Sequence, residues 1–267
     1  LNASLESTVT DRLTNFGYKS NKTGFSVGSG FEFYDDLYWN IGISSYIEKL
    51  DTDKTASASM KKQEGSYFDT FYNHTFSYDK RNQKYQASDG YISRFTQNIP
   101  LISESYTLTN IYDYKIYNEW LDENVFSIGF FGKTTNSLSG KDVKLSDRLY
   151  LPASKLRGFE SGKVGPKDGN DYIGGNYAAS INIATTLPQI LPNLQNTNFS
   201  IFFDAANIWG IDYDSALNDE SKIRSSVGIS VDLLTPVGPL NFSLSEPITK
   251  GNNDIKESFR FNIGTTF

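Results

Sequence analysis

Apolar and polar residues alternate with a period of two along most of this chain. The C-terminal segment 256–267 shows this most clearly, because the residues on one of its faces are Phe259, Phe261, Ile263, Thr265 and Phe267. The segments 223–235 and 239–248 also have one apolar face and one face of small or polar residues. Since successive side chains of a β-strand point to opposite faces, this pattern predicts three consecutive strands.

The same alternation predicts nine further strands, which makes about twelve in all, and no segment has a sustained helical period. These nine strands are expected near 4–15, 23–34, 36–50, 65–79, 90–100, 103–118, 123–133, 174–187 and 197–209. The sequence therefore predicts an all-β fold.

The connections between these strands differ in length. Residues 235–238 predict a tight turn, whereas 51–64, 134–171 and 210–221 are long and polar. Short turns at one end, longer loops at the other and aromatic residues near the strand ends are typical of a membrane β-barrel. A β-sandwich would also show alternation, but here the non-apolar faces are rich in Ser, Gly, Asn and Thr rather than Lys and Glu. The sequence thus favours an antiparallel transmembrane β-barrel over a soluble sandwich.

Composition narrows the range of functions. The 267 residues include 25 Lys and Arg against 31 Asp and Glu, which argues against nucleic-acid binding because a phosphate backbone needs a positive surface. The chain has no Cys, which excludes disulfides and thiolate chemistry, and its single histidine, His74, excludes a cluster of His ligands. No catalytic constellation and no calcium-loop spacing is present. We therefore expect neither enzymatic activity nor a metal site nor a cofactor.

Five motifs follow one another in order through the second half of the chain. They are Lys155-Leu-Arg-Gly-Phe-Glu160, Gly162-Lys-Val-Gly-Pro166, Gly174-Gly-Asn176, Phe202-Phe-Asp-Ala-Ala-Asn207 and Thr235-Pro-Val-Gly-Pro-Leu-Asn-Phe242. Together with the closing Phe267, this series resembles the BamA family of outer-membrane protein assembly factors, also known as bacterial surface antigens. The resemblance is strong from Arg157 to Phe267 and faint near Gly17.

The resemblance implies a sixteen-stranded barrel fed by periplasmic POTRA domains. The whole chain, residues 1–267, would then be one barrel domain with the last twelve strands, without the first four strands, the POTRA domains and the signal peptide. Segment 134–171 would be the long extracellular loop that folds back into the lumen. Its tip would carry the motif residues Leu156, Arg157, Gly158 and Phe159.

Strand parity suggests a partner for this arginine. In the strand predicted near 197–209, Asp204 and Phe202 lie opposite the more apolar face. Because a carboxylate that faces lipid is costly, we expect Asp204 to face the lumen, where it could form a bidentate pair with Arg157. The family pairs its loop arginine in a similar way, and its members often carry a second acid where this chain has Asn182.

The resemblance also implies a function, the insertion of β-barrel proteins into the outer membrane of a Gram-negative bacterium. A barrel that opens at a lateral seam offers a sheet edge with which an incoming strand can pair. One side of the seam would be the last strand, with Phe259, Phe261, Ile263, Gly264 and Phe267, which also resembles a C-terminal assembly signal.

The expected partners are unfolded outer-membrane β-barrel substrates, outer-membrane lipids and the accessory lipoproteins of an assembly complex. Two relatives remain as alternatives, namely a TamA-like factor and a two-partner secretion transporter that exports polypeptide. A passive porin is a less favoured alternative, because it leaves the order of the motifs unexplained.

Overall fold

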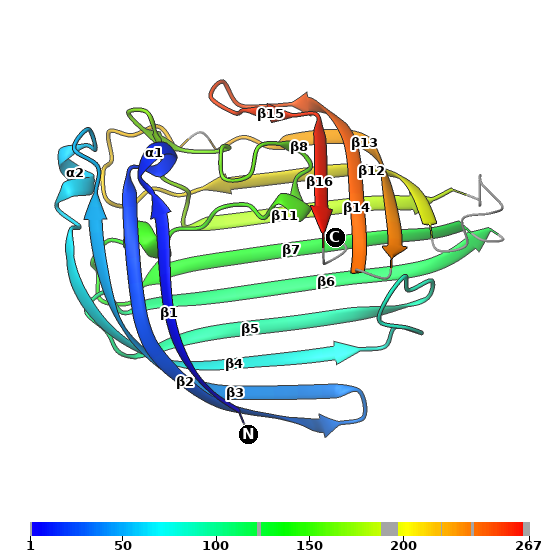
Figure 1. Ribbon diagram of the computed structural model, residues 1–267, viewed down its shortest axis with the longest axis horizontal. Helices are drawn as coiled ribbons and strands as arrows, with labels where there is room; N and C mark the ends of the chain where they lie inside the picture. The colour runs from blue at the N-terminus through cyan, green and yellow to red at the C-terminus, as the bar shows by residue number, and fades with distance from the viewer. Residues whose placement is uncertain (1, 122–123, 188–196, 220, 236–237, 264–267) are drawn as a thin grey trace.

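The computed structural model describes residues 2–121, 124–187, 197–219, 221–235 and 238–263. In this part of the chain, twelve strands lie in chain order in one antiparallel sheet (Figure 1). They are β1 (Asn2–Arg12), β2 (Tyr18–Tyr34), β3 (Leu37–Thr52), β4 (Gly65–Asp79), β5 (Gly90–Ile102), β6 (Thr107–Leu121), β7 (Asn124–Ser137), β11 (Tyr177–Thr186), β12 (Thr197–Trp209), β13 (Arg224–Thr235), β14 (Gly238–Thr249) and β16 (Phe259–Ile263). The predicted all-β fold of about twelve strands is confirmed.

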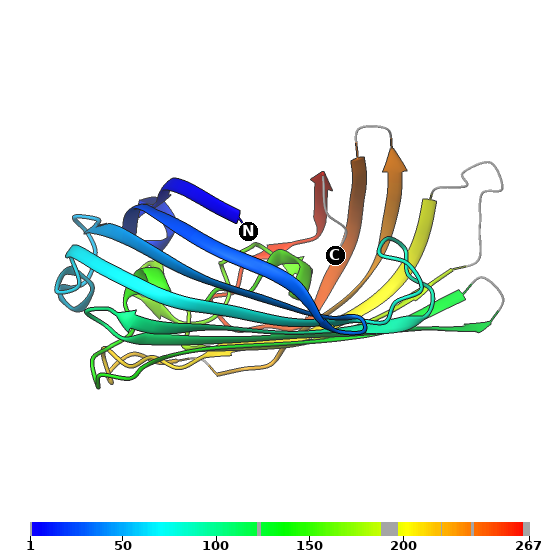
Figure 2. The ribbon, with the colours of Figure 1, turned by 90° about the horizontal axis from the view of Figure 1, so that it is seen from below.

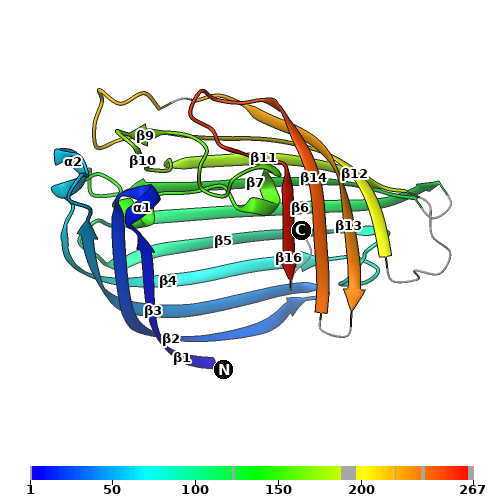
Figure 3. The same ribbon diagram turned by 45° about the horizontal axis from the view of Figure 1, so that its top comes forward.

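The sheet is strongly curved, and β1 and β16 lie at its two edges (Figure 2). Residues 138–176, hereafter the long loop, lie on its concave side (Figure 3). The remaining elements are short: α1 (Leu13–Phe16), α2 (Ala58–Lys61), the 3₁₀ helices η1 (Leu145–Asp147) and η2 (Ala153–Lys155), and the strands β8 (Gly158–Phe159), β9 (Lys167–Asp168), β10 (Asp171–Tyr172) and β15 (Lys256–Glu257). No helix in the described residues is long and apolar enough to cross a membrane.

The two faces of the sheet differ in the way that the alternation predicts. Large apolar side chains are exposed on the convex face, among them Ile201, Phe203, Val227, Ile229, Phe259 and Phe261. The residues between them are buried on the concave side, among them Ser200, Phe202, Asp204, Ser226, Ser230 and Arg260. A sandwich would cover its apolar faces, whereas the outer face of a membrane barrel is apolar and meets lipid. The distribution therefore supports the membrane barrel.

Several strand ends differ from the prediction. The strand expected from 103 begins at Thr107, because the Ser103 side chain accepts hydrogen bonds from the amides of Ser105 and Tyr106 and so makes a turn. At the same end of the β6–β7 pair, β7 continues to Ser137, which lies opposite Thr107, so the loop expected to begin at 134 starts at 138. Backbone pairing with β6 extends these polar residues as strand although they show no apolar alternation.

Two further expectations concern turns and the last strand. The segment expected as one strand, 256–267, is divided into β15, which pairs with the long loop, and β16, which pairs with β14. Gly264 and Phe267 lie outside the described residues, as do residues 236–237 of the expected tight turn.

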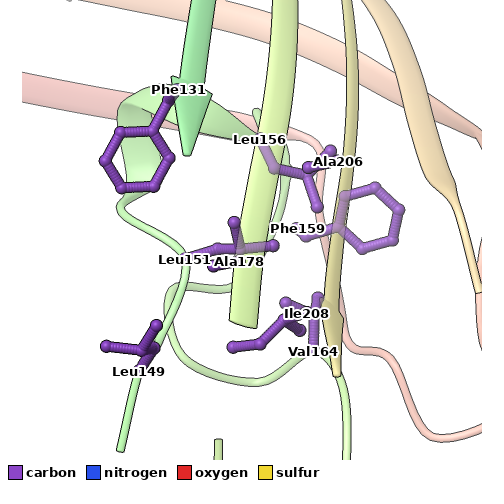
Figure 4. Packing of buried hydrophobic residues seen from close by; sticks show 9 residues of the cluster. All are labelled: Phe131, Leu149, Leu151, Leu156, Phe159, Val164, Ala178, Ala206 and Ile208. Carbon is purple, nitrogen blue, oxygen red and sulfur yellow. The ribbon is translucent and has the colours of Figure 1, made fainter. Parts of the chain in front are cut away.

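The larger of the two apolar core clusters in the described residues lies between the long loop and the concave face of the sheet (Figure 4). The loop contributes Leu149, Leu151, Leu156, Phe159 and Val164, and the strands contribute Phe131, Ala178, Ala206 and Ile208. A fully buried side chain of this kind stabilises a fold by about 1.5–3 kcal/mol relative to exposure. Packing therefore holds the loop inside the curved sheet before any polar contact is considered.

Candidate functional site

The structure brings Arg157, at the tip of the long loop, onto Asp204 in the middle of β12. Nε and Nη2 of the guanidinium donate to the two carboxylate oxygens, each at 2.7 Å, and the backbone amide of Arg157 donates to Oδ2 at 3.0 Å. The relative exposure is 7% for Arg157 and 0% for Asp204. This is the bidentate, charge-assisted geometry that planar guanidinium and carboxylate groups favour.

Two neighbours complete this contact. Asn182 of β11 donates from Nδ2 to Oδ1 of Asp204 at 2.8 Å and to the carbonyl oxygen of Lys155 at 3.1 Å. The guanidinium carbon of Arg157 lies 3.3 Å from the ring centroid of Phe202, in cation–π contact. The Asp204 carboxylate thus receives four hydrogen bonds, which is its full acceptor capacity. Within the described residues, Arg157 forms one ionic pair, with Asp204, and Asn182 stands where a second acid would lie.

At Gly158 and Phe159 the chain turns away from the Arg157–Asp204 pair and packs against the sheet. Gly158 has a φ of +88°, and a Cβ built on it would lie 3.1 Å from Cβ of Ser226, so a larger residue would be both strained and crowded. Ser226 of β13 donates to the carbonyl oxygen of Arg157 at 2.6 Å. Phe159 is 1% exposed and Leu156 is 3% exposed, and both belong to the apolar core. The four predicted tip residues therefore form one continuous contact with the sheet.

The predicted seam strand is described only in part. Within β16, Phe259, Phe261 and Ile263 are exposed on the convex face. Phe261 stacks on Phe242 of β14 with 4.8 Å between ring centroids. Gly264 and Phe267 fall outside the described residues, so their predicted roles stay predictions.

A second ionic cluster, which the sequence did not suggest, holds the start of the long loop. Nζ of Lys144 lies 2.7 Å from Asp69 on β4, 3.0 Å from Glu48 on β3 and 3.5 Å from Asp147. Lys22 on β2 lies 3.7 Å from Glu48. We name these residues the Lys144 cluster. Burial alone would lower the pKa of Lys144, but Asp147, Glu48 and Asp69 outweigh it and hold the pKa above its ordinary value.

The parity rule that placed Asp204 would also have placed two of these acids. Glu48 and Asp69 lie on strands and are fully buried, and a strand carboxylate is expected to avoid the lipid-facing side. Lys144 carries no such signal, because it lies in a polar loop without a motif.

Two arginines attach the long loop to its neighbouring connections. Arg148 donates to Asp212 at 2.8 Å and to the carbonyl oxygens of Gly210 and Ile173 at 2.8 and 3.1 Å. Arg224 on β13 pairs with Asp254, 2.9 Å from Nε to Oδ2, and both side chains are fully buried. Asp254 in turn accepts a hydrogen bond from the amide of Gly165 in the long loop at 3.2 Å, so Arg224 acts on the loop through Asp254. These contacts restrain the loop on the side away from its tip. In the described residues, no group of three or more His, Cys, Asp or Glu is arranged to hold a metal ion.

The whole chain matches a known protein family. The model of the Omp85 superfamily domain matches residues 1–267. The chain is 23% identical over 257 residues to the outer membrane protein assembly factor BamA of Neorickettsia risticii, a match that covers 94% of this chain and 34% of that protein. It is 25% identical over 238 residues to the sorting and assembly machinery component 50 homolog of Homo sapiens, covering 80% of this chain and 49% of that one. The chain thus spans a third to a half of these relatives.

A solved structure shares the fold of this chain. The fold superimposes with a TM-score of 0.81 and 23% identity on the crystal structure of BamA from Haemophilus ducreyi lacking POTRA domains 1–3, covering 96% of this chain and 56% of that one. The BamA resemblance of the motifs and the antiparallel barrel architecture are therefore confirmed. The chain belongs to the Omp85 superfamily.

Proposed function

We propose that this chain is the barrel portion of an outer-membrane assembly factor, which inserts β-barrel proteins by pairing their strands with the edge strand β16. The observation that carries the proposal is the place of β16 at the edge of the described sheet, with Phe259, Phe261 and Ile263 exposed on its outer face. The similarity to proteins named as assembly factors supports it.

The physical problem is the cost of unpaired backbone groups in lipid, several kcal/mol for each group. A strand that enters beside an existing edge finds partners for its amide and carbonyl groups as it enters, so the edge acts as a template. The apolar outer face of β16 would let the new pair remain in lipid. No covalent step is involved, so we do not class the protein as an enzyme.

The partners that this function requires are unfolded outer-membrane β-barrel substrates, outer-membrane lipids and accessory lipoproteins. The resemblance to BamA favours the outer membrane of a Gram-negative bacterium as the location. The resemblance to the sorting and assembly machinery component fits an outer membrane of mitochondria as well.

Site-specific cross-linking tests the proposal. The full-length protein that contains this chain is reconstituted in lipid vesicles with Phe261→Cys, and an unfolded β-barrel substrate carries one cysteine in its last strand. Ile201→Cys on β12 is the matched control, because Ile201 is 43% and Phe261 44% exposed on the same convex face. We expect disulfide formation with the substrate at Phe261→Cys alone, together with faster substrate folding on heat-modifiable gels. Equal cross-linking at the two positions would contradict an edge template.

The alternatives differ from the proposal in the place of contact, in the substrate or in the absence of any folding activity. A secretion transporter would pass its polypeptide through the lumen, so Thr109→Cys, on the concave side of β6 in a cavity of about 270 Å³, would cross-link to the polypeptide in transit. A TamA-like factor would use the edge but act on other substrates. A porin would accelerate no folding at all.

A further inference from the structure

The last strand carries an inward-facing arginine, Arg260, between Phe259 and Phe261. Both phenylalanines are exposed on the convex face, whereas Arg260 is 9% exposed. It lies opposite Ser243 of β14 in the sheet register. Its guanidinium therefore projects toward the long loop and not toward lipid.

The Arg260 guanidinium forms hydrogen bonds with the long loop on both sides of Arg157. Nη1 donates to the carbonyl oxygen of Ala153 at 3.0 Å, and Nη2 donates to that of Phe159 at 2.7 Å. Glu257 accepts from Nε at 2.6 Å and orients the group. The two carbonyls flank Arg157, so Arg260 spans the segment that carries the tip. Hydrogen bonds from a charged donor are stronger than neutral ones, and these carbonyls would be left without this donor if it were removed.

Backbone hydrogen bonds supply a second link between the loop tip and the last strand segment. Strand β15 pairs with β8 through Lys256↔Phe159 and Glu257↔Gly158. The amide of Glu160 donates to the carbonyl oxygen of Ile255 at 2.9 Å. Only one residue separates β15 from β16, so the loop tip and the edge strand are held together over a few residues.

We propose that Arg260 is a positioning residue that couples the edge strand to the loop tip, so that β16 leaves its resting place only when residues 153–160 move with it. This regulation deepens the proposed function and rests on it for its purpose. The mechanical link itself depends on contacts within this chain. Arg157 then acts on the edge strand through Arg260, although it does not touch β16 itself.

Hydrogen exchange of the full-length protein in detergent micelles, without substrate, tests the coupling. In Arg260→Ala we expect exchange to rise about tenfold or more both in residues 259–263 and in residues 153–160. Arg260→Lys keeps the charge but cannot reach both carbonyls and Glu257 together, so we expect an intermediate rise in both segments. Lys256→Ala is the matched control, because the Lys256 side chain makes its ion pair with the exposed Glu246 of β14 and the substitution keeps the backbone pairing of residue 256 with Phe159, so we expect no change in 153–160.

A double-mutant cycle separates a coupling from two local effects. Arg157→Ala should raise exchange in 259–263 in the wild-type background and add little to it when Arg260 is already alanine. The proposal is overturned if either single change affects only its own segment, or if the effect of Arg157→Ala on β16 persists in full in the double variant. Where Arg260→Ala does not fold, Arg260→Lys carries the same test.

Failure of this coupling is distinguishable from failure of the proposed function. Exchange is measured without substrate, so it reports the link even in a protein that assembles nothing. Conversely, substrate cross-linking at β16 with unchanged exchange in Arg260→Ala would leave the edge template standing and remove Arg260 from its control.

Discussion

Two of the ionic sites that attach the long loop to the rest of the fold differ in design. At the tip, one guanidinium meets one carboxylate, Asp204, with a neutral amide and an aromatic ring around them. At the start of the loop, the ammonium of Lys144 lies among three carboxylates, with Lys22 as a second cation. The first site is directional and balanced in charge, whereas the second depends on a point charge that offsets an excess of acid. Geometry should therefore govern the tip, and charge should govern the Lys144 cluster.

The largest effect is expected from Lys144→Met. The change leaves Glu48 and Asp69 buried without their main cation, and breaking a buried pair in this way costs about 3–5 kcal/mol of the free energy of unfolding. Thermal unfolding in detergent micelles, followed by heat-modifiable gel migration, measures the loss. A triple variant, Lys144→Met with Glu48→Gln and Asp69→Asn, should recover much of it. If Lys144→Met alone unfolds like wild type, the cluster does not hold the loop.

The Lys144 cluster should also respond to alkaline pH. The pKa of Lys144 is raised above its ordinary value of 10.5 in the folded protein. The stabilisation that the charged Lys144 gives is therefore fully present below pH 10.5 and is lost as the pH rises through the folded pKa. The difference in stability between wild type and Lys144→Met should therefore stay constant around neutral pH and shrink only in strongly alkaline buffer. Melting curves of both proteins over a pH series check this, and a difference that already shrinks at pH 8 would contradict it.

The next largest effect is expected at the tip. Arg157→Ala should lower the free energy of unfolding by about 2–3 kcal/mol, less than Lys144→Met, because Asp204 keeps its hydrogen bonds from Asn182 and from the amide of residue 157. Asp204→Ala should cost a similar amount, and the double variant should add little to either single change. Strictly additive losses in the same melting assay would exclude the pair.

The sequence predicted the residues of the tip site but not those of the Lys144 cluster. Alternation is local, so parity alone placed Asp204 and Phe202 on the concave side, and the ordered motifs directed attention to Arg157. Lys144 meets Glu48 and Asp69 over sequence separations of 96 and 75 residues, and no periodic pattern records such a distance. The parity of strand residues could have predicted that Glu48 and Asp69 face inward, but no such pattern predicts the place of Lys144.

Strand ends show the same limit. The alternating pattern predicted the strands well where one face is apolar. It ended β7 too early, because backbone pairing with β6 continues into polar residues that show no alternation. It also treated 256–267 as one strand, whereas β15 turns away to pair with the loop tip. That division depends on the folded loop, because Phe159 and Gly158 supply the pairing partners.

The smallest effect, and the most informative for the comparison, is expected from Asn182→Asp. This change gives the tip a second acid and so moves it toward the acid-rich design of the Lys144 cluster. The Asn182 amide now donates to Asp204 at 2.8 Å, and a carboxylate in its place would repel Asp204 while losing that bond. Arg157 offsets part of this repulsion, so we expect a loss of about 1 kcal/mol at pH 8, close to the net contribution of the lost hydrogen bond. The loss should fall at pH 5, because one proton shared between the two acids removes the repulsion.

Asn182→Ala is the control, since it loses the bond without adding charge and should show no such pH dependence. If Asn182→Asp instead stabilises the protein at pH 8, then charge and not geometry governs the tip as well, and the contrast between the two sites disappears.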